Sequence, residues 1–337
     1  MTGFGSAVDA TMDALIAPGF SRIGLAVRSA LLPEFTEGDS PRLDGKTVII
    51  TGATSGIGHA AAVALARHGA AIHFLARDQG RAERARHGIA AAAGAARISY
   101  GLADLGDLNS VRAFARRFSA THDRLDVLIH NAGAIHPEFR VGQAGTELTV
   151  ADQVVAPFLL TSLLMPALLA AAPSRVITVS SGGMYSQRLD PATLQLPASR
   201  YRGVTAYARA KRAQMALSRE WARRFTGTGV AFHAMHPGWV DTPGVAATLP
   251  RFRRLTRAIL LSPGQGADTI VWLATSPPER LGSGRFWHDR RPRPEHLLPW
   301  TRDKDPAAAR KLWDQVAAFT ASPGQPACVS GPDRGCV

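Results

Sequence analysis

From residue 46 onward, short apolar runs alternate with longer helical segments. The runs that predict strands are 47–50, 71–75, 97–102, 125–130, 175–179 and 230–235. The segment 107–119 is typical of the helices between them, because Asp107 can cap its start and its apolar positions recur on one face. This alternation predicts an α/β fold in which one parallel sheet carries helices on both faces.

The two ends of the chain lie outside this alternation. Residues 1–43 predict a helical extension with helices over about 6–16 and 21–32, and residues 301–337 predict one more helix and a mobile tail. The helix over 21–32 is apolar with two arginines, which suits a membrane surface or packing on the domain, and we expect packing. No repeat or linker divides residues 44–300, which therefore predict a single domain.

The run 154–173 contains no charged residue over about the length of a membrane span. Pro157 and Pro166 interrupt it, and a strand follows at once. The alternation of elements also requires a helix here. We therefore expect a helix buried in the centre of the fold rather than a membrane span.

A glycine-rich turn joins the first strand to a helix. Residues 51–58 read Thr-Gly-Ala-Thr-Ser-Gly-Ile-Gly, and an alanine-rich segment follows. Glycines lack the Cβ atoms that would keep a backbone from a pyrophosphate, and the start of the helix offers unpaired N–H groups. Three glycines also occur in turns that bind nothing, but the strand before them and the helix after them favour a dinucleotide site in a Rossmann-like, doubly wound sheet.

Composition is that of an ordinary globular protein, with 46% hydrophobic and 19% charged residues among 337. The net charge of +13 raises the alternative of a polyanion partner, but the arginines are spread over every helix and no nucleic-acid motif occurs, so we expect no nucleic acid. Cys328 and Cys336 lie in the tail and predict neither a disulfide framework nor a metal site. The first 20 residues do not read as a signal peptide, which favours a cytoplasmic protein.

Tyr207 and Lys211 are four positions apart on a predicted helix, so they share one face. An adjacent ammonium favours the phenolate and lowers the tyrosine pKa, so the pair can act as an acid and base. Such a pair also occurs on many exposed helices without a function. Ser180 and Ser181 follow the fifth strand at the edge where open α/β sheets bind ligands, although a Ser-Ser-Gly turn is also an ordinary strand exit.

In their order and spacing, four signatures resemble the short-chain dehydrogenase/reductase family in its single-domain form. They are the turn 51–58, Asn131-Ala132-Gly133, Ser181 ahead of Tyr207 and Lys211, and Pro237-Gly238 after the sixth strand. The resemblance covers about residues 44–285. Segments within 179–184, 235–245, 265–269 and 283–290 are similar to one dehydrogenase/reductase branch of that family, whose substrate is poorly defined.

The resemblance implies hydride transfer between nicotinamide and an alcohol or carbonyl carbon. Tyr207 would exchange a proton with the substrate oxygen, and Ser181, or less favourably Ser180, would hydrogen-bond that oxygen. Lys211 would hold the nicotinamide ribose and lower the Tyr207 pKa.

The same resemblance distributes the cofactor over the carboxyl ends of the strands. The glycine turn would receive the phosphates and Asp104 the adenine. Asn131 and Gly133 would lie at the adenosine side, and Val240 and Thr242 at the carboxamide. The implied cofactor residues are Gly52, Thr54, Ser55, Gly56, Ile57, Gly58, Arg77, Asp104, Asn131, Ala132, Gly133, Tyr207, Lys211, Pro237, Gly238, Val240 and Thr242.

One position departs from the family pattern, which has an asparagine in the central helix where this chain has Gln153. In the family, the main-chain carbonyl at that position holds a water that relays protons towards the lysine. Pro157 has no N–H to give to the carbonyl of Gln153 four residues earlier. We hypothesise that Pro157 keeps that carbonyl free for the water; the alternative is a weakened or lost activity.

Cofactor choice depends on Ala76, Arg77 and Asp78 after the second strand. An acidic residue at the strand end would bind the ribose diol of NAD, whereas an arginine would pair with the 2′-phosphate of NADP. Ala76 stands where relatives that prefer NAD have the acid, and Arg77 follows it. We therefore expect NADP, with NAD as the second choice because of Asp78.

Residues 242–261 combine apolar side chains with arginines between the sixth strand and the next helix. This segment suits an apolar lid over a lipophilic substrate, or equally a helix packed on the domain with its arginines in water. The sequence predicts an NADP(H)-dependent oxidoreductase for a small-molecule alcohol or carbonyl, compatible with a homo-oligomer. The main alternative is a redox-sensing or scaffold protein that has lost catalysis, and a membrane-surface protein is less favoured.

Overall fold

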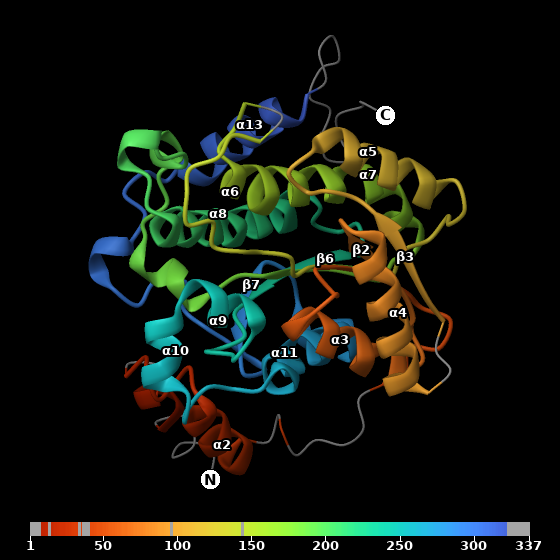
Figure 1. The fold of residues 1–337 in the computed structure, drawn as a ribbon, viewed down its shortest axis with the longest axis horizontal. Helices are drawn as coiled ribbons and strands as arrows, with labels where there is room; N and C mark the ends of the chain where they lie inside the picture. Colours follow the sequence, from red (N-terminus) through yellow and green to blue (C-terminus); the bar gives the residue numbers. More distant parts are fainter. Residues whose placement is uncertain are drawn as a thin grey trace.

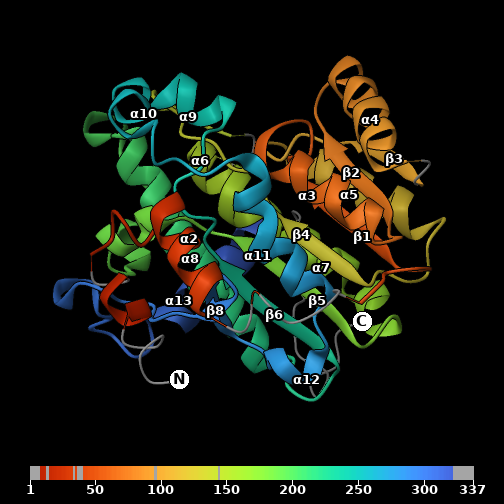
Figure 2. The ribbon, with the colours of Figure 1, turned by 90° about the horizontal axis from the view of Figure 1, so that it is seen from below.

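Eight strands form one sheet in the order β3-β2-β1-β4-β5-β6-β7-β8, and only the pair β7 and β8 is antiparallel (Figure 2). This description rests on a computed structural model that describes residues 8–12, 15–32, 35, 41–94, 97–142 and 145–321. The strands are β1 (Thr47–Thr51), β2 (Ala71–Ala76), β3 (Ile98–Leu102), β4 (Val127–His130), β5 (Ser174–Val179), β6 (Val230–Met235), β7 (Arg285–His288) and β8 (Arg291–Pro292). The predicted parallel sheet is confirmed, whereas β7 and β8 were not predicted.

Helices cover both faces of the sheet, as predicted (Figure 1). On one face lie α3 (Gly56–Arg67), α4 (Gln79–Ala93) and α11 (Pro263–Thr275). On the other lie α5 (Leu108–Ser119), α7 (Ala156–Ala170), α8 (Gly203–Arg224) and α13 (Ala308–Thr320). The shorter helices include α6 (Leu148–Val150), α9 (Pro243–Thr248), α10 (Pro250–Thr256), α12 (Pro278–Leu281) and the 3₁₀ turns η3 (Gly182–Ser186), η4 (Pro191–Thr193), η5 (Ala198–Arg200) and η6 (Pro299–Thr301). A separate apolar core lies on each face, so the sheet is buried on both sides.

The uncharged segment forms one continuous helical rod from α6 through a π-helical turn, η2 (Ala151–Val155), into α7. Among the described residues, the stretch Leu148–Ala170 is the one helix long and apolar enough to cross a membrane, and 72% of its most apolar window is buried. Its apolar side chains pack with α5 and α8 in one core. This burial agrees with the expected central helix.

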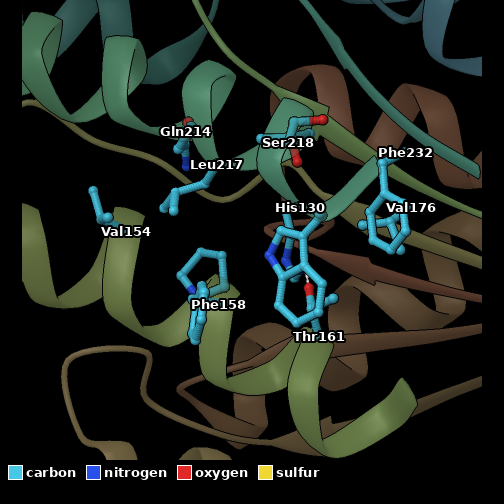
Figure 3. A pocket seen from close by; sticks show the side chains of 12 residues that line it. His130, Val154, Phe158, Thr161, Val176, Gln214, Leu217, Ser218 and Phe232 are labelled. Carbon is cyan, nitrogen blue, oxygen red and sulfur yellow. Dashed lines mark hydrogen bonds between the residues drawn. The ribbon is translucent and has the colours of Figure 1, made fainter. Parts of the chain in front are cut away.

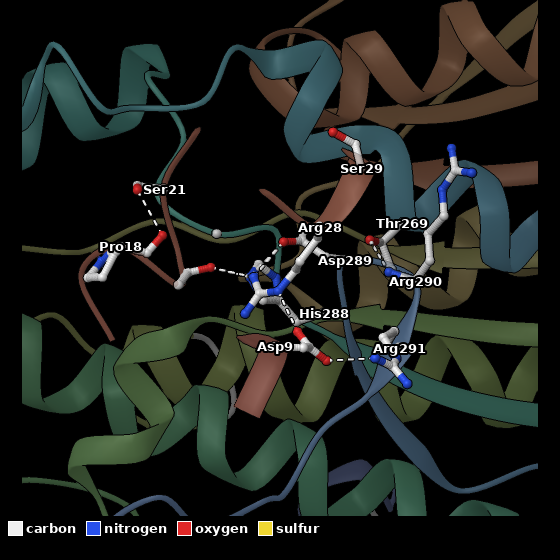
Figure 4. Close-up of polar contacts among 12 residues, drawn as sticks. Asp9, Pro18, Ser21, Arg28, Ser29, Thr269, His288, Asp289, Arg290 and Arg291 are labelled. Atoms are coloured by element: carbon white, nitrogen blue, oxygen red, sulfur yellow. Dashed lines mark hydrogen bonds and ion pairs between the residues drawn. The ribbon is translucent and has the colours of Figure 1, made fainter. Parts of the chain in front are cut away.

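The N-terminal extension packs on the domain through α2 (Arg22–Leu31), as expected (Figure 4). The Arg28 guanidinium is only 1% exposed and donates to Asp9 Oδ1 at 2.7 Å, Asp289 Oδ2 at 2.7 Å and the Gly19 carbonyl at 2.5 Å. Asp9 also accepts from Arg291 and Arg293. This buried cluster of charges fastens the extension to the β7–β8 end of the sheet.

Two expectations at the chain ends need comment. The helix expected over about 6–16 is helical at residues 8–12, but residues 15–20 form turns, so that expectation is wrong at its end. Pro18 and Gly19 account for the turns, because neither favours a helix interior. The expected tail beyond residue 321 lies outside the described residues.

Candidate active site

The turn after β1 requires glycine at three positions. Gly52 and Gly56 have φ of +72° and +58°, where a Cβ is strained. A Cβ on Gly58 would lie 2.4 Å from the Gly52 oxygen and 2.3 Å from Asn131 Nδ2. Ser55 precedes α3 without a side-chain capping bond, so the first N–H groups of this helix are not capped by Ser55. The turn thus presents backbone donors to an anion at the sheet's carboxyl edge.

Asn131 ties the end of β4 to this turn. Its Nδ2 donates to the carbonyls of Thr51 at 3.0 Å and Gly52 at 3.2 Å. The Thr51 hydroxyl accepts from the backbone N–H groups of Asn131 and Ala132, both at 3.0 Å. These bonds hold the glycine turn in place, so Asn131 shapes the cradle through its own hydrogen bonds.

Gly133 packs so closely against the predicted lysine that a Cβ would not fit. A Cβ at this position would lie 2.9 Å from Lys211 Nζ and 3.1 Å from Gln153 Oε1. Gly133 therefore lies on the lysine side of the site. Its expected place at the adenosine side stays a prediction.

The remaining predicted cofactor residues lie around the same edge. Asp104 follows β3 and accepts from the Gly106 N–H at 2.9 Å, while Arg77 follows β2 with an exposed side chain. Thr242 lies against the glycine turn, where its Cγ2 would be 3.4 Å from a Cβ on Gly56. Val240 is buried against α11, and Pro237-Gly238 turns beneath the N-terminal extension.

Ser181 and Tyr207 meet at the carboxyl end of β5. Ser181 is partly exposed, and its hydrogen bond to Tyr207 lowers the Tyr207 pKa, although burial raises it more. Ser180, in contrast, is buried and donates to the Lys211 carbonyl at 2.9 Å. Ser180 therefore braces α8, and Ser181 is the serine that faces the tyrosine, which agrees with the preferred assignment.

Lys211 has a buried ammonium group whose partners differ from those expected. Burial lowers the Lys211 pKa to about 8, opposed by the charge of Asp152. Nζ lies 5.4 Å from the centroid of the Tyr207 ring and donates at 3.0 Å to the Val179 carbonyl and at 3.0 Å to Gln214 Oε1. Burial sets the direction of the Tyr207 pKa, which is raised, and the expectation that Lys211 lowers it stays a prediction.

Gln153 lies in the π-helical turn η2. There the Ala156 N–H donates to the Ala151 carbonyl, five residues back. The proline at 157 lacks an N–H for the Gln153 carbonyl, which instead accepts from Gln214 Nε2 at 2.5 Å. The hypothesis that Pro157 keeps this carbonyl free for a water is therefore not confirmed, because the Gln214 side-chain amide bonds it.

A cavity of about 30 Å³ lies beneath this contact, between α7 and α8 (Figure 3). Gln214 faces it from α8, Val154 from η2, and His130 from the end of β4. His130 Nε2 hydrogen-bonds Thr161 Oγ1 at 2.7 Å, and its Nδ1 has no partner among the described residues. Burial, assisted by the Lys211 charge, lowers the His130 pKa to about 3, so this imidazole is neutral at pH 7.

The substrate side is walled by the N-terminal extension and the segment 242–261. Phe20 packs beside Gly182, whose Cβ would lie 3.2 Å from its ring, and the Phe20 carbonyl accepts from the Trp239 N–H at 2.6 Å. The segment folds as α9 and α10, in which no residue is fully buried and Leu255 is 85% exposed. This thin layer fits a lid better than a helix packed on the domain.

Sequence reasoning missed Gln214 and Phe20. Gln214 lies three positions after Lys211 and therefore on the same helical face, which was an available signal. Phe20 carried no local signal, because its place depends on how the extension folds back.

Comparison with known proteins matches residues 46–251 to the short chain dehydrogenase family. Bovine (Bos taurus) dehydrogenase/reductase SDR family member 12 is 39% identical over 272 residues, which cover 80% of this chain and 85% of that protein. This relative belongs to the branch that the further segments indicated. Human (Homo sapiens) retinol dehydrogenase 14 is 36% identical over 330 residues, covering 90% of this chain and 96% of that protein. A Beutenbergia cavernae protein, assigned as an NAD(P)-dependent gluconate 5-dehydrogenase and crystallised with NADP at low occupancy, superposes with a TM-score of 0.61 at 28% identity, covering 74% of this chain and 96% of that one.

Proposed function

This chain belongs to the short-chain dehydrogenase/reductase family of oxidoreductases, and we propose that it transfers hydride between NADP(H) and an alcohol/carbonyl pair. The observation that carries this proposal is the convergence of Ser181, Tyr207 and Lys211 beside the glycine turn. When bound, the nicotinamide would supply or accept the hydride. The three glycines and the uncapped start of α3 fit its pyrophosphate, and Lys211 would hold its ribose.

The chain's own residues would handle the proton. In reduction, the Tyr207 hydroxyl donates its proton to the carbonyl oxygen, and the Ser181 hydroxyl donates a hydrogen bond to the same oxygen. The raised pKa of Tyr207 favours the protonated form at neutral pH, which is the form that reduction needs. In oxidation, the tyrosinate accepts the proton from the alcohol.

NADPH oxidation against a panel of carbonyl compounds tests this function. We expect turnover by the wild type and loss of turnover in Tyr207→Phe, with NADPH affinity retained, because only the acid is removed. Turnover that survives in Tyr207→Phe would refute the role of this residue. A wild type that binds NADPH but turns over no carbonyl would favour the alternative, a cofactor-binding protein that has lost catalysis, for which Gln153 is the supporting feature.

We propose NADP(H) over NAD(H) on the environment of Arg77. Its side chain is exposed at the end of β2 and has no hydrogen-bond or ion-pair partner among the described residues. The neighbouring Asp78, which was the reason for doubt, caps α4 by accepting from the Arg81 N–H at 2.7 Å. A free arginine and an engaged carboxylate support recognition of a 2′-phosphate.

Binding of NADPH and NADH to Arg77→Ala tests the cofactor choice, with Arg81→Ala as the matched control. A charge-assisted bond is worth about 1.5–3 kcal/mol, so NADPH affinity should fall at least tenfold in Arg77→Ala while NADH affinity changes little. Arg81→Ala should bind both cofactors as the wild type does. Equal losses for the two cofactors would defeat the proposal.

For the substrate, we propose a lipophilic alcohol or carbonyl. Phe20, Val245 of α9, and Phe252 and Leu255 of α10 supply apolar side chains beside the arginines of α10, and human retinol dehydrogenase 14 is named for a lipophilic alcohol. The carbonyl panel should therefore include retinaldehyde and a short polar aldehyde, and the former should have the higher kcat/KM. We also propose a cytoplasmic location, which cell fractionation with the intact chain would test.

A further inference from the structure

One side chain links the lysine of the site to the central helix. Gln214 comes from α8, one turn after Lys211, and is almost fully buried. Its Oε1 accepts from Lys211 Nζ at 3.0 Å, and its Nε2 donates to the Gln153 carbonyl at 2.5 Å. An amide has one acceptor end and one donor end, and both ends are used here.

Both partners of this amide are buried polar groups that gain a hydrogen bond from it. The Gln153 carbonyl lies in the π-helical turn, four residues before a proline that has no N–H. A buried carbonyl without a donor is destabilising, and a buried ammonium without acceptors is more so. Among the described residues, Lys211 Nζ also donates to the Val179 carbonyl at 3.0 Å.

The position of this amide is also the position that the family resemblance gives to a water. That water would accept from the lysine and donate to the carbonyl of the central helix. Gln214 makes the same two contacts with a covalently attached group. Unlike a water, an amide that is anchored at both ends cannot rotate to pass a proton on.

We propose that Gln214 is a positioning residue that holds the Lys211 ammonium in place of a relay water. The amide fixes Nζ between the Val179 carbonyl and the site, and closes the route from Lys211 to the Gln153 carbonyl. This proposal rests on the proposed function for the role of Lys211, but the contact itself can be measured in the protein without cofactor or substrate.

Lysine titration by NMR tests the contact directly. The chain has only four lysines, at 46, 211, 304 and 311, so ¹³C-lysine labelling gives four Cε signals. In Gln214→Leu, Lys211 loses an acceptor worth about 1.5–3 kcal/mol, so its pKa should fall by about one pH unit or more. In Gln214→Glu the acceptor remains, so the Lys211 pKa should not fall.

Ser218→Ala is the matched control, because Ser218 is buried on the same helix one turn further on and lines the same cavity. If the role of Gln214 is merely structural, Gln214→Leu lowers the stability of the protein but has the same Lys211 pKa as Ser218→Ala. That result would overturn the proposal. The other three lysines report whether the fold is intact.

If Gln214→Leu does not fold, an NMR measurement on the wild type tests the contact instead. The side-chain amide ¹⁵N–H signals of Gln214 are assigned by their loss in Gln214→Glu. Their chemical shifts should change with pH at the midpoint of the Lys211 titration, and shifts that do not change there would refute the contact. Failure of the proposed function can be told apart from failure of this proposal. If the wild type turns over no carbonyl, the Lys211 titration and the Gln214 amide shifts can still be measured.

Discussion

Acid should destabilise this protein in part through His130 and His233, two of the buried histidines whose pKa values the fold lowers. His130 is 3% exposed and His233 is fully buried. Burial lowers both pKa values to about 3, helped by the Lys211 charge at His130 and by the charges of Arg175 and Arg285 at His233. The folded pKa values lie below the ordinary 6.5. The contribution of the two neutral imidazoles to the free energy of unfolding is therefore fully present above pH 6.5 and is lost as the pH falls from 6.5 towards 3.

The size of the effect follows from proton linkage. At about pH 5, protonation stabilises each imidazole of the unfolded state by about 2 kcal/mol, whereas the folded imidazoles stay neutral. The two histidines therefore lower the free energy of unfolding by about 4 kcal/mol relative to about pH 8. Two protons also set a slope of about 2.7 kcal/mol per pH unit between about pH 4 and pH 6. This is a large share of the stability of a typical domain.

Urea unfolding curves at a series of pH values measure this loss, followed by tryptophan fluorescence. Other groups titrate over the same range, so the informative quantity is the difference between wild type and the variants His130→Gln and His233→Gln. Each variant should recover about 2 kcal/mol of the loss between about pH 8 and pH 5, because it removes one of the two imidazoles. Variants that keep the wild-type pH dependence would refute the assignment of this loss to the two histidines.

Two further predictions concern the extension and the glycine turn. Asp9→Asn should lower the free energy of unfolding by about 3–5 kcal/mol and more than Arg28→Met does, because it removes the negative charge that Arg28, Arg291 and Arg293 share, whereas Arg28→Met removes a single positive charge from the cluster. Urea unfolding checks the order, and the reverse order would refute this charge count. Gly58→Ala should abolish NADPH binding, measured by fluorescence titration, because its Cβ would lie 2.4 Å from the Gly52 oxygen; unchanged affinity would show that the turn can yield.

The sequence predicted those parts of the fold whose pattern is local. The strands β1 to β6 are mostly apolar runs bounded by turn residues, so each carried its own signal. The strands β7 and β8 did not, because Arg285–His288 mixes charged and aromatic side chains and β8 holds only Arg291 and Pro292. The place of α2 depends on the contact between Arg28 and Asp289, which are 261 residues apart.

The lysine end of the site shows why a departure from a family pattern must be read with its neighbours. Gln153 by itself suggested a damaged proton relay. The structure joins it to two other residues, because Pro157 removes a backbone donor and Gln214 supplies one from another helix. A buried carbonyl must be satisfied by some group. The π-helical turn, the proline and the second glutamine therefore act as one unit, and the sequence contained all three without showing that they meet.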